Sequence, residues 1–227
     1  MYKSKTFLAV ILARGGSKRL PHKNTMMLRD KPLIAWSIEA GLNSKYIDEV
    51  VLSSDDAKIL DIALEYDAKT IHRPAHLASD ESSSFDAVEH LMQNYKTYDY
   101  IVLLQPTSPL RTSKHINEAI ELLLEKKADA IVSVCENEHS PLWSNTLPKD
   151  DSLEGFIREE VKGKRSQDLP KYFQLNGAIY ICDAKRLLEE KSFFLKDNIF
   201  AYKMQREDSI DIDEELDFKL AELLLNS

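Results

Sequence analysis

Residues 7–24 read FLAVILARGGSKRLPHKN, an apolar run that ends in a basic loop with two glycines. The apolar part, Phe7–Ala13, is typical of a strand buried on both faces of a parallel sheet. Gly15 and Gly16 let a ligand approach the backbone amides of the loop closely. The positive charge of the loop comes from Arg14, Lys18, Arg19 and Lys23. This combination favours a site for a polyphosphate, with a solvated basic loop as the alternative.

Two common phosphate-binding patterns are absent from this loop. A Walker loop would end in Gly-Lys-Ser or Gly-Lys-Thr, and a dinucleotide fingerprint would read Gly-x-Gly-x-x-Gly. The sequence therefore favours neither a P-loop NTPase nor a dinucleotide-dependent oxidoreductase.

The chain has 227 residues, of which 43% are hydrophobic, and a formal net charge of −8. This size suits one α/β domain, which we place over residues 1–227, and the acidic charge argues against a general nucleic-acid binder. No apolar run in the sequence is long enough to span a bilayer, and the N-terminal run has no signal-peptide cleavage pattern. Cys135 and Cys182 lie in apolar runs and are expected to be reduced core thiols. We expect a cytoplasmic protein with neither membrane nor nucleic acid as a partner.

Strand and helix patterns alternate along most of the chain. Strands are expected over residues 7–13, 49–53, 69–72, 100–104, 130–135, 178–182 and 200–204. Helices are expected over residues 32–43, from Asp55 or Asp56 to Tyr66, and over 86–95, 113–126 (capped by Ser113), 184–191 and 214–225. The alternation predicts an α/β fold with a doubly wound, mostly parallel sheet.

Polar residues follow three of the expected strands. The three segments are the loop from Arg14, Ser53-Ser54-Asp55 and Gln105-Pro-Thr-Ser-Pro109. Ligands of doubly wound sheets bind beyond the carboxyl ends of the strands. The sequence therefore predicts that these segments meet in one crevice.

Residues 136–173 interrupt the alternation with three prolines, many charges and little periodicity. Such a segment is too long and too charged for an ordinary internal connection, so we expect an arm that faces a partner. Its apolar residues include Leu142, Trp143, Leu153 and Phe156, a grouping that favours an interface between subunits. A mobile surface excursion is the alternative.

A pair of carboxylates precedes the last expected helix, in Ile210-Asp211-Ile212-Asp213. In an extended segment Asp211 and Asp213 project to one face, while Ile210 and Ile212 anchor the other. Paired carboxylates suit Mg²⁺, which takes one or two protein oxygens and completes its shell with water and phosphate oxygens. For Asp213, capping of the helix that follows is the alternative.

Other polar clusters have simpler explanations. Ser79-Asp80 with Ser82-Ser83-Ser84 is explained by a loop and a helix N-cap. The six histidines show no metal-ligand spacing. The sequence contains no nucleophile elbow and no Ser-His-Asp arrangement, so covalent catalysis is not expected.

Five segments resemble the signatures of the acylneuraminate cytidylyltransferases, also known as CMP-sialic acid synthetases. They are Ala13–Lys18 with Lys23-Asn24, Arg73–Asp80, Leu104–Arg111, Asn176–Tyr180 and Ser209–Asp213. Each is weak alone, and the resemblance rests on all five occurring in the family's order along nearly the whole chain.

The resemblance implies a Rossmann-like sheet of the nucleotide-diphospho-sugar transferase type that uses CTP and Mg²⁺. In that family the anomeric hydroxyl of a nine-carbon 2-keto sugar acid, N-acetylneuraminate, attacks the α-phosphate of CTP, and pyrophosphate leaves. Legionaminic acid or a related diamino sugar is the alternative acceptor, and an eight-carbon acid is less favoured. A non-catalytic nucleotide-binding regulator is the alternative from another class.

The resemblance also implies roles for the residues at matching positions. The nucleotide would be bound by Arg14, Gly15, Ser17, Lys18, Lys23, Asn24, Arg73 and Ser84. The metal would be held by Asp211 and Asp213, and the catalytic residues would be Arg14, Lys23 and Asp211. The sugar acid would be bound by Gln105, Arg165, Gln174, Asn176, Tyr180, Phe193 and Phe194, with the two phenylalanines forming a pocket for its N-acyl group.

The arm over residues 136–173 resembles one that crosses to the second subunit of a homodimer, where Arg165 would complete the partner's sugar site. Two positions depart from the family pattern: Arg19 stands where glycine is usual, and Gln174 stands where arginine is frequent. Glutamine cannot make the bidentate contact that arginine makes to a carboxylate. The departures therefore concern the identity of the sugar more than the chemistry.

Overall fold

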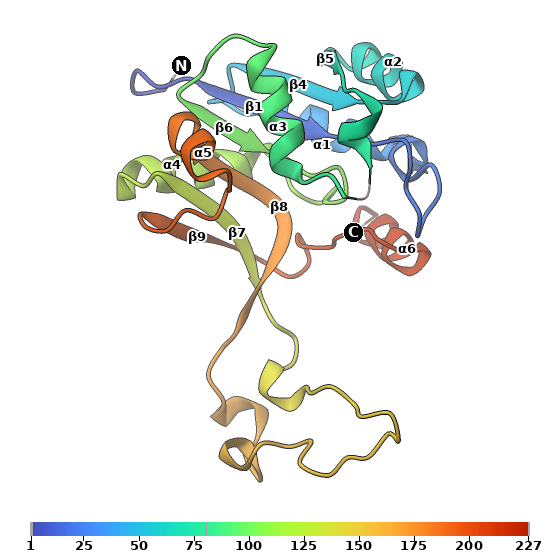
Figure 1. The fold of residues 1–227 in the computed structure, drawn as a ribbon, viewed down its shortest axis with the longest axis vertical. Coiled ribbons are helices and arrows are strands. Elements are labelled where there is room, and N and C mark those ends of the chain that lie inside the picture. The colour runs from blue at the N-terminus through green and yellow to red at the C-terminus, as the bar shows by residue number, and fades with distance from the viewer. Residues whose placement is uncertain (1, 80, 227) are drawn as a thin grey trace.

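The computed structural model describes residues 2–79 and 81–226 of the chain. Its main strands are β1 (Phe7–Leu12), β4 (Glu49–Ser54), β5 (Lys69–His72), β6 (Tyr100–Leu103), β7 (Ala130–Glu136), β8 (Phe173–Asp183) and β9 (Ile199–Met204). They form one seven-stranded sheet in the order β5-β4-β1-β6-β8-β7-β9 (Figure 1). Within the described ranges every pair in this sheet is parallel except the two made by β8, which runs antiparallel to β6 and β7.

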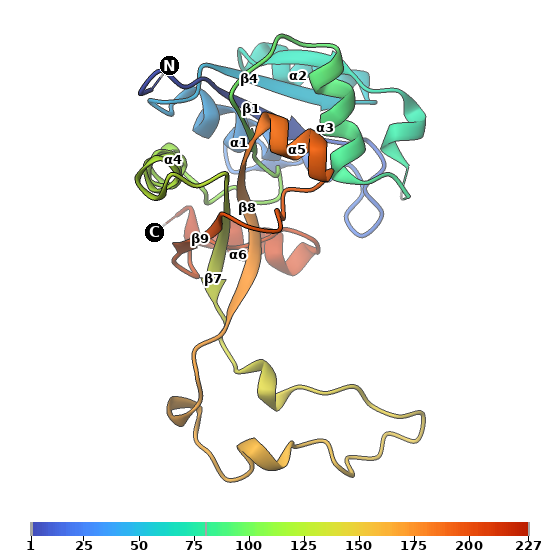
Figure 2. The same cartoon turned by 60° about the vertical axis from the view of Figure 1, so that its left-hand side comes forward.

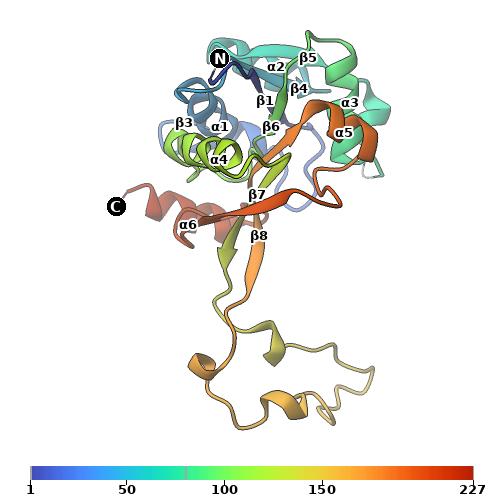
Figure 3. The same cartoon turned by 90° about the vertical axis from the view of Figure 1, so that its left-hand side faces the viewer.

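Six α-helices accompany the sheet in the described part of the chain. They are α1 (Leu33–Leu42), α2 (Ala57–Glu65), α3 (Ser84–Gln93), α4 (Ser113–Lys126), α5 (Ala184–Glu190) and α6 (Glu215–Leu224). Helices α1 and α4 lie on one side of the sheet, and α3 and α5 lie on the other (Figures 2 and 3). A small two-stranded sheet, β2 (Met27–Leu28) with β3 (Lys31–Pro32), leads into α1. The expected doubly wound, mostly parallel α/β fold is confirmed.

The apolar strand β1 explains why two helical layers form. Phe7 and Ile11 belong to the core packed against α1, α2 and α4, whereas Leu8 and Val10 belong to the core packed against α3 and α5. A strand with apolar residues on both faces buries them only between two layers. Helix α6 forms a third, smaller core, in which Phe218 packs with Leu33 of α1.

The helix starts follow from their caps, with two corrections to the sequence expectations. Asp56 caps α2 by accepting the backbone N–H of Lys58 at 2.8 Å. Helix α3 begins at Ser84 rather than Asp86, because Asp86 is the third residue of a capping box with Ser83. Thr112 rather than Ser113 occupies the cap position of α4. Each expected helix is present, and its boundaries differ by a few residues at most.

Strand β8 is longer than expected, because it begins at Phe173 rather than Ala178. Its first residues continue the pairing with the end of β7, as in the Cys135–Gln174 and Glu136–Phe173 pairs. The two strands form a stalk, and residues 137–172 form an arm at its end, far from the helical layers (Figure 1). The arm contains three short 3₁₀ turns, Pro141–Trp143, Glu159–Val161 and Ser166–Asp168.

Cys135 and Cys182 are buried and unpaired, as expected for core thiols. Across residues 2–79 and 81–226, no helix has the length and apolar character needed to cross a membrane.

Candidate active site

A cavity of about 580 Å³ opens beyond the carboxyl ends of β1 and β6. Its wall includes nine of the residues assigned to the site from the sequence: Arg14, Ser17, Lys18, Lys23, Asn24, Arg73, Ser84, Gln105 and Asp213. These residues come from the loops after β1, β5 and β6, from the start of α3 and from the segment before α6. Asp80 ends one of the five segments and lies outside the described residues. Two of the three predicted segments, those beginning at Arg14 and at Gln105, therefore meet at this cavity, whereas Ser53-Ser54-Asp55 does not line it and reaches the site through the contact of Asp55 with the loop after β1.

The loop after β1 is held by its own polar contacts. Asn24 donates its side-chain amide to the carbonyl of Arg14 at 3.0 Å, and Gly15 donates its N–H to Asp55 Oδ1 at 3.1 Å. A Cβ at Gly15 would lie 2.8 Å from Asp56 Oδ2, so this position requires glycine. The Gly15 amide is thus used in a hydrogen bond that holds the loop. At Gly16 there is open space, because a Cβ there would meet nothing of the described structure within 4 Å.

Lys23 joins this loop to the segment before α6. It is largely buried, follows His22 in a left-handed conformation with φ of 58°, and donates to the carbonyl of Ile212. Its ammonium also lies 3.3 Å from Asp213 Oδ1, and Arg19 Nη1 lies 2.7 Å from Asp213 Oδ2. The Asp213 carboxylate therefore forms ion pairs with two cations, Lys23 and Arg19, at the cavity wall.

Arg73 is a buried arginine on the wall of the cavity, and some of its hydrogen-bond donors lack acceptors among the described residues. Its side chain is 6% exposed, and its nearest carboxylate, Asp55, lies 4.0 Å away. Nε and Nη2 have no hydrogen-bond partner in the part of the chain that the structure describes. Burial lowers the pKa of the guanidinium, Asp55 opposes that change and Arg14 adds to it. Buried donors without acceptors are costly, so this arginine is suited to a ligand that supplies acceptor oxygens.

Gln105 lines the cavity, and Gly177 and Asp211 lie beside it without lining the cavity themselves. Gly177 has a φ of 72°, and a Cβ there would lie 3.3 Å from Gln105 Oε1 and 3.8 Å from Asp211 Oδ2. Glycine is therefore needed for both its conformation and the close approach of these polar atoms.

An aromatic cluster of Tyr180, Phe193 and Phe194 adjoins this part of the cavity wall. The Tyr180 ring meets Phe193 and Phe194 edge-on, at centroid distances of 5.9 and 6.1 Å. Tyr180 is the direct cross-strand partner of Leu103, which lines the cavity. Burial raises the pKa of the Tyr180 hydroxyl, and the nearby charge of Asp211 raises it further. The polar cavity thus continues towards an apolar surface.

The pair Asp211 and Asp213 is backed by a fully buried Ile212, whose N–H donates to the Thr107 carbonyl at 2.8 Å. Asp211 is exposed, but neighbouring protein atoms partly desolvate its carboxyl and raise the pKa; Asp213 adds to this, while the Thr107 hydroxyl and Lys23 oppose it. Asp213 does not cap α6, because that position belongs to Glu214 with Asp217.

Two carboxylates are a small ligand set. Among residues 2–79 and 81–226, no group of three or more His, Cys, Asp or Glu side chains could hold a metal ion. Asp211 and Asp213 nevertheless fit Mg²⁺, since this ion commonly takes one or two carboxylates and shares the rest of its shell with phosphate and water.

Six of the seven expected sugar-side residues are absent from the cavity wall: the three aromatic residues adjoin it, and Gln174, Arg165 and Asn176 lie elsewhere. Gln174 is exposed on the stalk. Arg165 lies in the arm, with its Nε 3.0 Å from Asp168 Oδ2. Asn176 is buried, accepts from the Ser133 hydroxyl at 2.6 Å and donates to the Ser209 hydroxyl at 2.9 Å. Its amide therefore connects β7, β8 and the segment after β9.

Some cavity residues were not assigned to the site from the sequence. Ser79, Ser82 and Ser83 line the wall beside Ser84, although they also serve as loop and cap residues. Arg111, a residue of the Leu104–Arg111 segment, does not line the cavity but is buried in the protein. It is 1% exposed and donates to the Ser37 hydroxyl at 2.6 Å and the Gln105 carbonyl at 3.3 Å. The cluster of hydroxyl groups before α3 could have been recognised from the sequence as part of the site. The burial of Arg111 could not have been recognised in this way.

Residues 8–224 match the model of a family described as "Cytidylyltransferase". The N-acylneuraminate cytidylyltransferase of Escherichia coli O18:K1:H7 is 39% identical over 215 residues, covering 94% of this chain and 51% of that protein. The CMP-N,N'-diacetyllegionaminic acid synthase of Legionella pneumophila is 38% identical over 229 residues, covering 96% of this chain and 95% of that protein. The chain thus spans about half the length of the first relative and nearly all of the second.

Among solved structures, a CMP:2-keto-3-deoxy-manno-octonic acid synthetase complexed with CTP superposes with a TM-score of 0.74 at 17% identity, over 97% of this chain and 98% of the other. This likeness concerns the fold. The family match covers nearly the whole sequence and confirms the resemblance carried by the five segments: the chain belongs to the cytidylyltransferase family.

Proposed function

We propose that this chain transfers CMP from CTP to the anomeric hydroxyl of a nine-carbon 2-keto sugar acid and releases pyrophosphate. N-acetylneuraminate is the proposed acceptor, and N,N'-diacetyllegionaminate is the alternative, because relatives named for each acid are almost equally similar to the chain. The observation that carries the proposal is the meeting of Arg14, Lys18, Lys23 and Arg73 in one cavity together with Asp213, in a protein that is acidic overall.

The proposed chemistry needs positioning and charge neutralisation rather than a protein nucleophile. Arg14, Lys18 and Lys23 lie where they can neutralise the triphosphate, with Arg14 and Lys23 bearing on the reacting phosphates. Arg73 and Ser84 also line the cavity and are proposed to bind the cytidine end. During the reaction the sugar oxygen forms a bond to the α-phosphorus, the bond to the β-phosphate oxygen breaks, and pyrophosphate carries away the negative charge.

Asp211 and Asp213 are proposed to hold Mg²⁺, which would polarise the phosphates and lower the pKa of the attacking hydroxyl. Asp213 now pairs with Lys23 and Arg19, so binding of a charged nucleotide would redistribute these contacts. Both carboxylates must be ionised to bind the metal ion. Because the pKa of Asp211 is raised, metal binding should weaken as the pH falls through that pKa.

The sugar acid is proposed to lie between Gln105 and the aromatic cluster. Gln105 offers an amide beside Gly177 and Asp211, and Phe194 is half exposed next to Tyr180. An apolar surface next to a polar end suits an N-acylated sugar. The carboxylate of the sugar acid is proposed to be bound by Arg165 of a second subunit.

The proposed assembly is a homodimer in which the arm packs on the partner. The arm exposes Leu147, Leu153 and Ile157, and its stalk exposes Phe173 and Leu175. A lone monomer rarely keeps so many apolar side chains exposed on one projection. A cytoplasmic location is also proposed, supported by two cysteines that are buried and unpaired.

The decisive experiment is pyrophosphate release with CTP, Mg²⁺ and a panel of acids. The panel contains N-acetylneuraminate, N,N'-diacetyllegionaminate and an eight-carbon 2-keto sugar acid. Release with a nine-carbon acid supports the proposal, and the highest kcat/KM identifies the acceptor. CTP binding without release from any acid would instead support a non-catalytic nucleotide-binding protein.

A further inference from the structure

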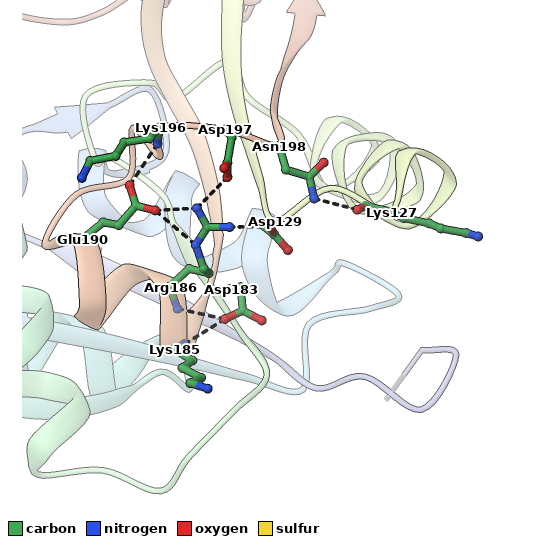
Figure 4. Close-up of polar contacts among 9 residues, drawn as sticks. All are labelled: Lys127, Asp129, Asp183, Lys185, Arg186, Glu190, Lys196, Asp197 and Asn198. Atoms are coloured by element: carbon green, nitrogen blue, oxygen red, sulfur yellow. Dashed lines mark hydrogen bonds and ion pairs between the residues drawn. The ribbon is translucent and has the colours of Figure 1, made fainter.

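One arginine and three carboxylates form a cluster at the end of the sheet away from the cavity. Arg186 of α5 lies 2.8 Å from Asp129, 2.8 Å from Asp197 and 2.5 Å from Glu190 (Figure 4). Asp129 directly precedes β7, and Asp197 lies shortly before β9. The cluster therefore belongs to the amino ends of these strands, whereas the cavity lies at carboxyl ends.

The cluster closes the base of one loop, residues 191–198, which we call the aromatic loop. The loop leaves α5 after Glu190 and returns to the sheet at β9. Glu190 Oε2 accepts the backbone N–H of Lys196 at 3.0 Å, and Asp197 is held by Arg186 (Figure 4). Asn198 donates its amide to the Lys127 carbonyl at 3.0 Å. The end of the loop that returns to the sheet is thus fixed to α5 and to the connection before β7.

The aromatic loop carries Phe193 and Phe194, the two rings that meet Tyr180. Phe193 is 7% exposed and Leu195 is 5% exposed, so both enter the core, whereas Phe194 is 51% exposed. The placement of Phe194 is therefore set mainly by the loop backbone, and less by burial of its own ring. Any change at the base of the loop would alter the aromatic cluster while leaving the phosphate end of the cavity in place.

Arg186 supplies the charged part of this anchoring, beside the hydrogen bonds of Lys196 to Glu190 and of Asn198 to Lys127. Asp129, Glu190 and Asp197 share Arg186 as their common cation in the described structure. Hydrogen bonds from Arg186 lower the pKa of Glu190, which keeps that carboxyl ionised. Without the guanidinium, the carboxylates would repel one another across the base of the loop.

We propose that Arg186 is a positioning residue that fixes the aromatic loop against Tyr180 and thereby sets selectivity for the N-acyl substituent of the sugar acid. The selectivity part of this inference rests on the proposed function. The anchoring part rests on the contacts of Arg186 alone.

The first test compares wild type with Arg186→Met, which keeps a long side chain but removes the charge. Two acids are used: N-acetylneuraminate and its analogue with a hydroxyl in place of the acylamino group. We expect the KM for the acylated acid to rise by about tenfold, the lower end of the range for a small change in fit within an apolar pocket. The KM for CTP and the kcat/KM for the analogue should change far less. Arg186→Lys should be intermediate, because it keeps the charge but not the forked contacts.

Lys219→Met is the matched control, since Lys219 forms an exposed ion pair with Glu215 on α6. Asp197→Asn removes one contact of the cluster and serves if Arg186→Met does not fold. An unchanged ratio of kcat/KM between the two acids, in a folded Arg186→Met protein, would overturn the selectivity role.

Hydrogen exchange gives a readout that does not depend on activity. In Arg186→Met the amide of Lys196 and its neighbours in the aromatic loop should exchange faster, while amides of β1 and α4 keep their protection. Unchanged exchange in the loop would overturn the anchoring. If wild type released no pyrophosphate with any acid, the proposed function would fail, and the exchange result would still decide the anchoring.

Discussion

The ammonium of Lys23 lies 3.3 Å from the carboxylate of Asp213, although the two residues are 190 positions apart in the sequence. This pair joins the loop after β1 to the segment before α6 at the wall of the cavity. Both residues are proposed to bind the nucleotide with its metal ion: Lys23 would contact a phosphate, and Asp213 would contact the metal ion. Their mutual contact keeps each charge satisfied and correctly placed before the ligand arrives.

Lys23→Met tests the cationic half of this pair. Methionine retains much of the buried stem, so the packing changes little and the charge is lost. We expect kcat/KM for pyrophosphate release to fall by about 10²–10³-fold, as for loss of one electrostatic contact to a transition state. Lys58→Met, at an exposed position on α2, is the control. A fall of less than threefold would contradict a role for Lys23 at the reacting phosphates.

Asp211→Ala tests the proposed metal site. We expect turnover to fall by at least about a hundredfold, because the loss of the carboxylate weakens charge stabilisation at the reacting phosphate. CTP binding should persist in part, since the basic side chains remain. The assay is pyrophosphate release across a Mg²⁺ titration, with Glu215→Gln as the nearby exposed control. Normal activity at saturating Mg²⁺ would show that Asp211 has only a structural role.

Arg73→Met should affect stability and binding in opposite ways. The buried guanidinium has donors without partners, so its removal should leave the free energy of unfolding within about 1 kcal/mol of wild type, or above it. CTP binding should weaken by about 1.5–3 kcal/mol, the range for hydrogen bonds to a charged group. Denaturant unfolding and calorimetric titration measure the two quantities. Unchanged CTP affinity would argue against contact between Arg73 and the nucleotide.

The raised pKa of Asp211 predicts how stability depends on pH. A folded-state pKa above the ordinary value of 3.8 means that the folded protein favours the neutral carboxyl. This contribution to stability is fully present below 3.8 and is lost as the pH rises through the raised pKa. Asp211→Asn, which is always neutral, should therefore be more stable than wild type at neutral pH, with the difference vanishing as the pH falls. Unfolding curves across this range, without Mg²⁺, provide the check, and a less stable variant at neutral pH would contradict it.

Much of the fold was predictable because its central strands are continuous apolar runs. Phe7–Leu12 and Tyr100–Leu103 are buried on both faces, and each is followed by polar residues at its carboxyl end. The convergence of these polar segments follows from the topology of parallel strands, so the cavity could also be predicted. The start of β8 could not be predicted, because Phe173, Gln174 and Leu175 are exposed, although they pair with β7.

The individual contacts in the site were less predictable, because they depend on partners distant in sequence. Asn176 lies in a family segment, yet its amide is used by Ser133 and Ser209. Arg111 lies in a polar turn, yet it is buried and holds the Gln105 carbonyl. Residue type and spacing indicate which groups gather near a site, but the hydrogen-bond partner of each group depends on the folded geometry.

The final prediction concerns assembly and the placement of Arg165. Within its own chain this residue lies in the arm, exposed and paired with Asp168, and it does not line the cavity. If the arm crosses to a second subunit, Arg165 can offer its fork to the carboxylate of the sugar acid there, which would compensate for glutamine at position 174. An Arg165→Ala homodimer lacks the donated arginine in both sites, and an Asp211→Ala homodimer lacks the metal ligand in both.

Mixing the two variants under conditions that allow subunit exchange should therefore restore activity. Each mixed dimer has one site with both Asp211 and a donated Arg165, and up to about a quarter of wild-type activity is expected after random exchange, since half of the dimers are mixed and each has one intact site. Lys171→Ala, which removes an exposed stalk pair with Glu136, replaces Arg165→Ala in the control mixture and should show no dependence on exchange. Sedimentation at the assay concentration must show a dimer; a fully active monomer, or no recovery in the mixture, would mean that Arg165 does not act across subunits.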